Sequence, residues 1–343
     1  MQEKIIYAVT DYNGLFGSKH NAAPYKSGMD KNKLAEHFKS LGYKLTFIHP
    51  TDISFSDDWA NKPVIYTSQE DPGYIYKDFL EDIILSFETK GANLIPSYKH
   101  LRANNNKAFM HMLEEISLSD VCNIIPNKRF STLSELKSFT DITYPVVIKL
   151  ATGAMSQNVE LVKNYNELVK FVKNNSQSFS QWNRFKEFVR SFKYTGYKKQ
   201  DLIKNKYILQ DFLPNLESDY KILKFDDYFY IFKRPVRDND FRASGSGQHN
   251  YLYGSSSDVP TGIFELVDKI AKAIDTPTIS VDIAVSNNEL YVIEYQSLYF
   301  GTVGQHRSDI VYTKIDNTYK PSINNFELEE LYARSIINYL ESK

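Results

Sequence analysis

Residues 280–301 read SVDIAVSNNELYVIEYQSLYFG and contain two apolar runs typical of β-strands. Asp282 lies inside the first run, and Glu294 and Gln296 lie inside the second. A two-residue connection would pair Asp282 with Ile293, whereas a three-residue loop at 287–289 would pair it with Glu294. The three-residue loop is favoured because it places the large apolar side chains of both runs on one face. These side chains are Val281, Ile283, Val285, Tyr291, Ile293 and Tyr295.

In this register Asp282, Glu294 and Gln296 share the opposite face of the hairpin. Two opposed carboxylates repel each other unless a cation or a proton lies between them. Oxygen ligands alone suit a hard ion such as Mg²⁺, which commonly binds phosphates as well. The pattern therefore predicts a metal site. The alternative is a solvent-facing polar side at the edge of a sheet.

The composition of the whole chain narrows the class of protein. It has 343 residues, a net charge of −1 and a charged fraction of 24%, which argues against disorder and against nucleic acid as a partner. No apolar run approaches the roughly 20 residues of a membrane span, and no signal peptide is visible at the start. The single cysteine, Cys122, excludes an internal disulfide. We therefore expect a cytoplasmic protein with no membrane partner.

Strand-like and helix-like segments alternate in the first hundred residues. Apolar runs at 4–10, 44–50 and 64–68 are interspersed with amphipathic segments that end near Gly42 and Gly91. This alternation predicts an open, largely parallel α/β sheet, whose ligands bind beyond the carboxyl ends of its strands. The loop after the first run contains Tyr12, Lys19 and His20, which we predict to contact substrate.

The fold class is α/β, with α+β character in the C-terminal part. We predict an N-terminal α/β domain at 1–103 and a central lid subdomain at 104–206. A C-terminal antiparallel-sheet domain at 207–343 carries the metal site. The lid contains a polar and basic insertion at 176–206, which is predicted to be a solvated helical arm or a flap.

Three further motifs carry groups that suit phosphates, a planar base or carboxylates. The segment VVIKLATGAMS ends a strand in Lys149 and continues in small residues that allow backbone N–H groups to approach phosphate. The segment YILQDFLP forms a hinge that could present backbone groups to a base. The segment KRPVRDNDFRASGSG brings together Arg234, Arg237 and Arg242, whose guanidinium groups suit oxyanions. Each pattern alone also fits a surface lysine, an ordinary turn or a solvated run of charges.

The order of these motifs resembles that of the ATP-grasp superfamily of carboxylate–amine ligases. The pattern is most similar to ribosomal-protein glutamate ligase and to glutathione synthetase-like members, and it covers about residues 104–301. It begins at Lys107 in NNNKAFMHML and ends at Glu294-x-Gln296. The resemblance implies an ATP-grasp fold and ATP with Mg²⁺ as cofactors, as one or two ions, with Mn²⁺ as a substitute.

The resemblance also implies roles for individual residues. The two lysines would contact ATP phosphates, the loop after Lys149 would fold over them, and the hinge and a following acid would hold adenine and ribose. The residues at these nucleotide-binding positions are Lys107, Lys149, Gly153, Ser156, Gln210, Asp211, Leu213 and Glu217. Asp282 and Glu294 match the magnesium ligands, and Gln296 stands where the family usually has asparagine.

The implied reaction has two steps. A substrate carboxylate attacks the γ-phosphate of ATP to give an acyl phosphate and ADP, and an amine then displaces phosphate. Arg242, with Arg234 as the second candidate, would stabilise the acyl phosphate and the tetrahedral oxyanion. Arg237 and His249 join Tyr12, Lys19 and His20 as predicted substrate contacts.

The expected substrates are a small-molecule or saccharide-linked carboxylate and an amine or amino acid, and a homodimer is the candidate assembly. Two rival interpretations remain open at this stage. The first is a phosphotransferase of the same fold, and the second is a catalytically silent nucleotide-binding protein.

Overall fold

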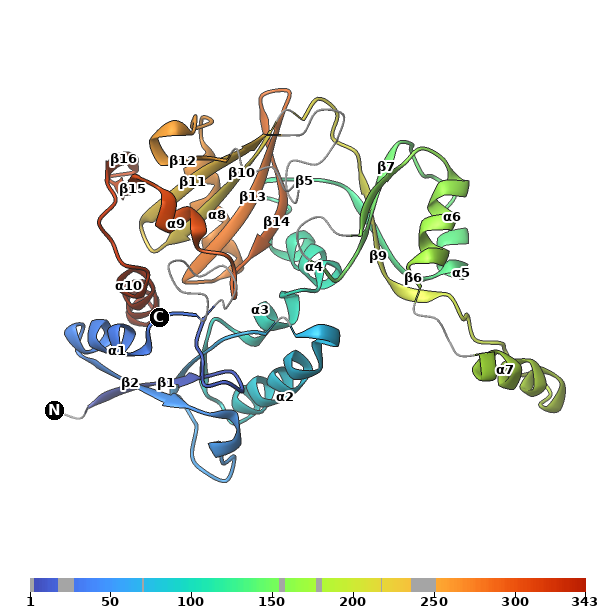
Figure 1. Ribbon diagram of the computed structural model, residues 1–343, viewed down its shortest axis with the longest axis horizontal. Coiled ribbons are helices and arrows are strands. Elements are labelled where there is room, and N and C mark those ends of the chain that lie inside the picture. Colours follow the sequence, from blue (N-terminus) through green and yellow to red (C-terminus); the bar gives the residue numbers. More distant parts are fainter. Residues whose placement is uncertain are drawn as a thin grey trace.

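The structure is a computed structural model that describes residues 3–17, 28–69, 71–153, 158–176, 181–216, 218–235 and 251–343. Its strands form three sheets, one parallel and two largely antiparallel, with helices packed against them (Figure 1). The α/β class predicted from the sequence is confirmed. The division of the chain into three domains stays a prediction.

The first sheet is parallel and has the strand order β2-β1-β3-β4. Its strands are β1 (Lys4–Val9), β2 (Tyr43–Ile48), β3 (Pro63–Tyr66) and β4 (Asn93–Ile95), and its helices are α1 (Lys31–Ser40) and α2 (Ile75–Thr89). Helix α1 begins where the Asp30 carboxylate accepts hydrogen bonds from the N–H groups of Asn32 and Lys33. Short connections are the 3₁₀ turns Pro50–Asp52 and Pro72–Tyr74 and helix α3 (Tyr98–Ala103). The predicted open parallel sheet is therefore present.

The middle sheet has the order β6-β9-β7-β8 and is antiparallel. It comprises β6 (Asn127–Thr132), β7 (Val146–Leu150), β8 (Val159–Val162) and β9 (Lys204–Asp211). Helices α5 (Leu133–Lys137) and α6 (Tyr165–Asn174) share one core with it, built around Ile148, Leu168 and Tyr207. Helix α7 (Gln181–Lys193) projects away from this sheet at the side of the molecule (Figure 1).

The third sheet has the order β16-β15-β11-β10-β13-β14-β5, with β12 paired to β11. Its strands are β5 (Asn123–Ile124), β10 (Ser218–Phe225), β11 (Tyr228–Pro235), β12 (Leu252–Tyr253), β13 (Thr278–Ser286), β14 (Glu289–Gln296), β15 (Ile310–Ile315) and β16 (Thr318–Ile323). Helices α4 (Lys107–Leu118) and α8 (Ile263–Ile274) pack on one face, around Val281 and Ile283. The remaining pieces are the 3₁₀ turn Gly254–Ser256 and helices α9 (Val303–Arg307) and α10 (Leu328–Glu341).

The other face of the third sheet is divided into an apolar half and a polar half. Leu223, Phe225 and Tyr230 pack in one core with α1, α10 and the first sheet. The register places the charged residues on the same face, beyond these apolar ones. These residues are Asp219, Lys221, Arg234, Asp282 and Glu294. One surface of the sheet thus serves as both core and candidate site.

The β13–β14 hairpin has the predicted pairing of Asp282 with Glu294, but its turn and its register differ from the prediction. Ser286 pairs with Glu289, so the turn has two residues, Asn287 and Asn288, with φ of 51° and 64°. Two consecutive positive φ values fit a type I′ turn, and the predicted three-residue loop is wrong. A β-bulge between Asp282 and Ile283 then shifts the register by one residue. Asp282 therefore lies opposite Glu294, as predicted.

The bulge also changes which side chains of β14 enter the core. The sequence predicted Tyr291 and Ile293 on the apolar face, and both positions are wrong. Val292 instead packs with Val281 and Tyr295, and it is Val292 that pairs with Ile283. A bulge depends on one extra residue in one strand, which the alternation of apolar residues does not reveal.

Candidate functional site

Lys107 connects three parts of the chain that are distant in sequence. It is the first residue of α4, and its Nζ lies 3.2 Å from Glu294 Oε1 on β14. The same Nζ donates a hydrogen bond to the carbonyl of Gly153 at 2.8 Å, in the loop after β7. The backbone N–H of Lys107 donates to the Ala151 carbonyl at 2.8 Å, which fixes the start of α4 against this loop. The ammonium group thus lies between the middle and third sheets.

Lys149 is buried near the carboxyl end of β7, and its Nζ donates to Gln210 Oε1 on β9 at 2.5 Å. Burial lowers the pKa of Lys149 to about 8; the charge of Glu294 acts in the opposite direction, and that of Lys107 lowers the pKa further. A lysine whose hydrogen-bond partner is a neutral amide lacks a counter-charge in contact. The geometry therefore favours an anion close to Lys149 and Lys107.

Asp282 forms ion pairs with two cationic side chains, those of Lys221 and Arg234. Its Oδ1 accepts a hydrogen bond from Lys221 Nζ at 2.6 Å, and its Oδ2 lies 2.8 Å from Arg234 Nη2. The Nε of Arg234 also donates to Asp219 Oδ1 on β10. Burial acts to raise the pKa of Asp282, but the charges of Arg234 and Lys221 outweigh burial and lower it. Burial dominates at Asp219, so its pKa is raised in spite of Arg234.

We expect the substitution Arg234→Met to lower the free energy of unfolding by about 3–5 kcal/mol at pH 7, because it leaves the buried carboxylate of Asp219 and the partly buried one of Asp282 with one cation. The loss should shrink at pH 5. The pKa of Asp219 is already raised in the folded protein, so the folded state binds a proton more readily than the unfolded chain as the pH falls below 6. Urea unfolding at the two pH values measures both effects.

The matched control for this substitution is Lys221→Met, which removes the cation that contacts Asp282 alone. Its effect should be smaller, because Arg234 still pairs with both carboxylates. Equal losses for the two variants, or a loss that does not depend on pH, would show that Arg234 is not the centre of the network.

The donor set of Asp282, Glu294 and Gln296 fits Mg²⁺ by its chemistry. Asp282 pairs with Glu294 and Ser280 pairs with Gln296, so the three side chains leave the same face of the hairpin. Two carboxylates and an amide are hard oxygen donors, and Mg²⁺ completes its six positions with water and phosphate oxygens. Within the described ranges, no group of three or more His, Cys, Asp or Glu side chains surrounds a common point. An ion here would thus depend on phosphate oxygens for part of its coordination.

The hinge, residues 210–213 at the end of β9, connects the middle and third sheets. Gln210 is its buried member and faces Lys149. Asp211 is exposed, and its N–H donates to the Pro126 carbonyl at 2.9 Å, while Leu213 is half-buried. Gln210 therefore contacts the lysine cluster, the name used from here on for Lys107, Lys149 and the nearby Glu294. Asp211 and Leu213 follow Gln210 in sequence, and their predicted contact with the base stays a prediction.

Several predicted residues lie outside the described residues, and their roles stay predictions. They are Lys19, His20, Ser156, Glu217, Arg237, Arg242 and His249. Tyr12 is described: it follows β1, is 47% exposed, and its ring contacts that of Tyr76 at 4.8 Å between centroids. Tyr12 thus lies at the carboxyl edge of the first sheet, where a substrate contact was predicted.

The segment after β14 links the carboxyl edge of the first sheet to the strand that carries Glu294 and Gln296. Residues 297–302, which we name the strap, follow β14 and pack against the first sheet through Leu298 and Tyr299. The Asn104 amide donates to the Leu298 carbonyl at 3.1 Å, and the Ser68 hydroxyl donates to Asn104 Oδ1 at 2.7 Å. Tyr299 has a φ of 58°, a left-handed conformation unusual for an aromatic residue. The strap is therefore fixed against the first sheet and Asn104.

A buried polar group at the end of β1 also meets the strap. The Asp11 carboxylate accepts hydrogen bonds from the N–H groups of Asn13 and Leu15, and from Gln69 Nε2 at 3.1 Å. The Tyr299 hydroxyl donates to Gln69 Oε1 at 3.4 Å. The sequence carried a signal for these residues, since polar side chains follow the apolar runs of β1 and β3 directly.

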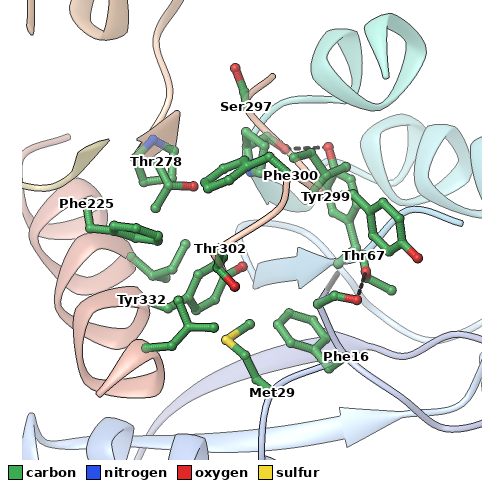
Figure 2. A pocket seen from close by; sticks show the side chains of 17 residues that line it. Phe16, Met29, Thr67, Phe225, Thr278, Ser297, Tyr299, Phe300, Thr302 and Tyr332 are labelled. Carbon is green, nitrogen blue, oxygen red and sulfur yellow. Dashed lines mark hydrogen bonds between the residues drawn. The ribbon is translucent and has the colours of Figure 1, made fainter. Parts of the chain in front are cut away.

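Figure 2 shows a pocket between the strap, the carboxyl edge of the first sheet and α10. Phe16, Met29 and Tyr332 form one wall, and Phe225 and Phe300 form another. Its hydroxyl groups come from threonine, serine and tyrosine, and none of its lining residues carries a charge. Ser297, which lines the pocket, directly follows Gln296 in the sequence, whereas Asp282, Glu294 and Gln296 are not among the lining residues. The chemistry of the pocket suits an uncharged part of a small molecule.

The sequence matches no protein-family model and no curated protein. Solved structures do match over almost the whole chain. A RimK-domain ATP-grasp protein from Sphaerobacter thermophilus has a TM-score of 0.53 and 11% identity, covering 96% of this chain and 98% of its own. D-cycloserine synthetase DcsG has a TM-score of 0.52 and 13% identity, with 98% and 99% covered. The ATP-grasp ligase PsnB, solved with a minimal precursor, Mg and ADP, has a TM-score of 0.53 and 12% identity, with 97% and 96% covered.

Proposed function

We propose that this chain, which has the ATP-grasp fold, is an ATP-dependent ligase that joins a carboxylate to an amine. The observation that supports this most strongly is the convergence of Lys107 and Lys149 near Glu294. Two ammonium groups and a carboxylate, on three separate elements, form a site suited to phosphates bound together with a cation. Two of the three structures compared are named as ATP-grasp proteins, and two are named as ligase or synthetase.

The proposed nucleotide site spans the middle and third sheets. Lys107 and Lys149 bind the phosphates, and the loop that includes Gly153 and Ser156 closes over them. Gln210, Asp211, Leu213 and Glu217 hold the base and the ribose. Asp282, Glu294 and Gln296 would hold Mg²⁺, which supplies positive charge for the phosphate oxygens when bound. PsnB, of similar fold, was solved with Mg and ADP, which supports the proposal that this chain binds an adenine nucleotide together with Mg²⁺.

In the proposed reaction a substrate carboxylate oxygen attacks the γ-phosphorus of ATP, and the bond to the bridging oxygen of ADP breaks. The amine nitrogen then attacks the acyl carbon, and phosphate leaves as the amide forms. Arg242 stabilises the oxyanion in this second step. Arg234 is committed to Asp219 and Asp282, so we assign it the task of positioning Asp282 rather than direct contact with substrate.

The substrate would enter at the edge of the first sheet. The uncharged pocket beside the strap takes the neutral part of a small-molecule or saccharide-linked acid, and Tyr12 lies along the same edge. The proteins of similar fold have names as different as D-cycloserine synthetase and an ATP-grasp ligase solved with a minimal precursor. The pair of substrates therefore has to come from experiment.

The test is an assay that measures ADP and free phosphate together, with panels of carboxylates and amines. We expect phosphate release only when a carboxylate and an amine are both present, in a ratio of one to one with ADP. The control omits Mg²⁺, and turnover should cease. ADP with a stable phosphorylated product would indicate a phosphotransferase. A rise in melting temperature with Mg-ATP but no turnover on any panel would indicate a nucleotide-binding protein without activity.

A further inference from the structure

Helix α7 exposes an apolar face that the rest of the described chain leaves uncovered. Trp182 is 61% exposed and Phe192 is 75% exposed. The exposed large apolar side chains of the helix are Trp182, Phe185, Phe188, Val189 and Phe192. Among the described residues, none of the four core clusters includes a residue of α7. Figure 1 shows the helix projecting beyond the middle sheet, away from the candidate site.

The opposite face of α7 is covered by the chain that follows it. Glu187 is buried, and its carboxylate accepts hydrogen bonds from the Tyr197 hydroxyl at 2.7 Å and from the Gln200 N–H at 3.1 Å. Arg190 also donates to it, at 2.9 Å. At 100° per residue, Glu187 lies on the side of the helix opposite Phe185 and Phe192. The only acidic side chain of α7 therefore faces inward, and the apolar face points outward.

Basic residues border this apolar face. Residues 181–200 contain six lysines and arginines and one acidic residue, a net charge of +5, although the whole chain has −1. Helical spacing puts Lys186 and Lys193 on one border and Arg184 on the other. The Lys186 ammonium lies 5.4 Å from the centre of the Trp182 ring. Lysine stems that run along aromatic rings and keep the charge at the margin are typical of side chains at an apolar–water boundary.

We propose that α7 binds the surface of an anionic lipid bilayer, with its aromatic face in the headgroup region. An amphipathic helix with tryptophan and phenylalanine on one face and lysine and arginine at its borders is typical of helices that lie in this plane. The mode is surface attachment, since no helix in the described ranges is long and apolar enough to cross a bilayer. The proposal departs from the prediction, made from the lack of a spanning run, that the chain has no membrane partner.

A second copy of the chain and an acidic peptide fit this helix less well. Thirteen residues extend about 20 Å, and one face of that length is far smaller than the roughly 800 Å² per partner of a stable interface. Two copies would also bring together two segments of charge +5, which repel each other. A helix that projects alone is convex, whereas a peptide ligand is usually held in a groove.

The experiment is co-sedimentation of the full chain with vesicles of phosphatidylcholine containing about 30% phosphatidylglycerol, against vesicles of phosphatidylcholine alone. We expect binding to the anionic vesicles that weakens as salt is added. The chain has two tryptophans, and Trp59 is buried. In a Trp59→Phe background, emission from Trp182 should shift to shorter wavelength on binding.

Two variants separate the contributions of the face and its borders. The first changes Trp182, Phe185 and Phe188 to serine, and the second changes Arg184, Lys186 and Lys193 to glutamate. Each basic residue near an anionic surface contributes about a fivefold factor in affinity, so the second variant should bind about a hundredfold more weakly or worse. Ile323→Ser, on edge strand β16, is the matched control, because Ile323 is 73% exposed and distant in sequence.

The controls decide the outcome. Melting temperatures and Mg-ATP binding should be unchanged in both α7 variants, because α7 contributes no residue to the proposed nucleotide site. The proposal is overturned if the protein ignores anionic vesicles, or if the variants bind them as tightly as the parent. It is also overturned if light scattering shows a dimer of the parent that is a monomer in the first variant. Binding to acidic peptides but not to anionic vesicles would overturn it as well.

Discussion

Glu294→Gln should reduce ADP formation by at least about a thousandfold and leave the fold intact. Glutamine has the same shape as glutamate but no charge, so it removes the attraction for Lys107 and for a cation. Glu294 Oε1 is 3.2 Å from Lys107 Nζ, and Glu294 is the residue that pairs with Asp282 across the hairpin. The variant therefore interrupts both the lysine cluster and the proposed metal residues at one point.

Stability should be almost unaffected by this change. The Lys107–Glu294 pair is partly exposed, with 24% of the Glu294 side chain accessible, and such pairs contribute little to folding. Removing one of two opposed carboxylates also relieves their mutual repulsion. We expect the free energy of unfolding to change by less than about 1 kcal/mol.

The matched control is Glu289→Gln, which makes the same change on the same strand. Glu289 is exposed at the turn, where it accepts a hydrogen bond from the Tyr291 hydroxyl at 2.8 Å. Its turnover should equal that of the parent. Calorimetry with a non-hydrolysable ATP analogue and Mg²⁺ complements the ADP assay. Activity close to the parent in Glu294→Gln would mean that the proposed site is misplaced.

Lys149→Met should weaken ATP binding by about 10- to 100-fold at pH 7, the usual effect of losing a charged hydrogen bond. It should also remove a pH dependence. The pKa of Lys149 is about 8 in the protein without nucleotide, so the amine is charged below pH 8 and increasingly neutral above it. Bound phosphate favours the ammonium form, and binding above pH 8 must therefore take up a proton.

The affinity of the parent protein for ATP should consequently be constant below pH 8 and fall by up to about tenfold per unit above it. The methionine side chain of the variant does not titrate, so its profile should be flat over this range. Titration calorimetry from pH 6.5 to about pH 9.5 distinguishes the two cases. Lys206→Met is the control, since Lys206 is an exposed residue of β9. An unchanged slope in Lys149→Met would assign the titration to another group.

The same substitution carries an opposite expectation for stability. Because the pKa of Lys149 is lower in the folded protein than in the unfolded chain, burying the charged amine opposes folding below pH 8. The parent should gain stability as the pH rises from 8 towards 10. Methionine avoids this burial of charge, so the variant should be at least as stable as the parent at pH 7. Loss of binding in a protein of undiminished stability would identify a functional lysine.

The hairpin illustrates how far the sequence could predict the site. The alternation of apolar residues and the demand for a common face were enough to place Asp282 opposite Glu294. They were not enough to predict the two-residue turn or the bulge, because two errors of one residue in the register cancel between the turn and the carboxylates. The predicted pairing of Asp282 with Glu294 is thus right, although the predicted turn length is wrong.

The ion-pair partners of Asp282 could not be predicted from the sequence, for a different reason. Lys221 and Arg234 reach it because β10 lies between β11 and β13, an order that no local pattern reveals. The contacts of the strap with Asn104 and the first sheet likewise depend on how distant segments dock. Local patterns located many of the strands and suggested the candidate residues, whereas tertiary packing decided which charges meet.

Lys107 and Lys149 belong to elements of different sheets. Lys107 begins α4, which packs on the third sheet through Met110 and Leu118, whereas Lys149 lies in the middle sheet. The first and third sheets share a core through α10, and the middle sheet continues into the third by the hinge at Gln210–Leu213. A phosphate bound by both lysines would therefore bridge the middle and third sheets, which meet at the start of α4 through the hydrogen bonds of Lys107 to Ala151 and Gly153.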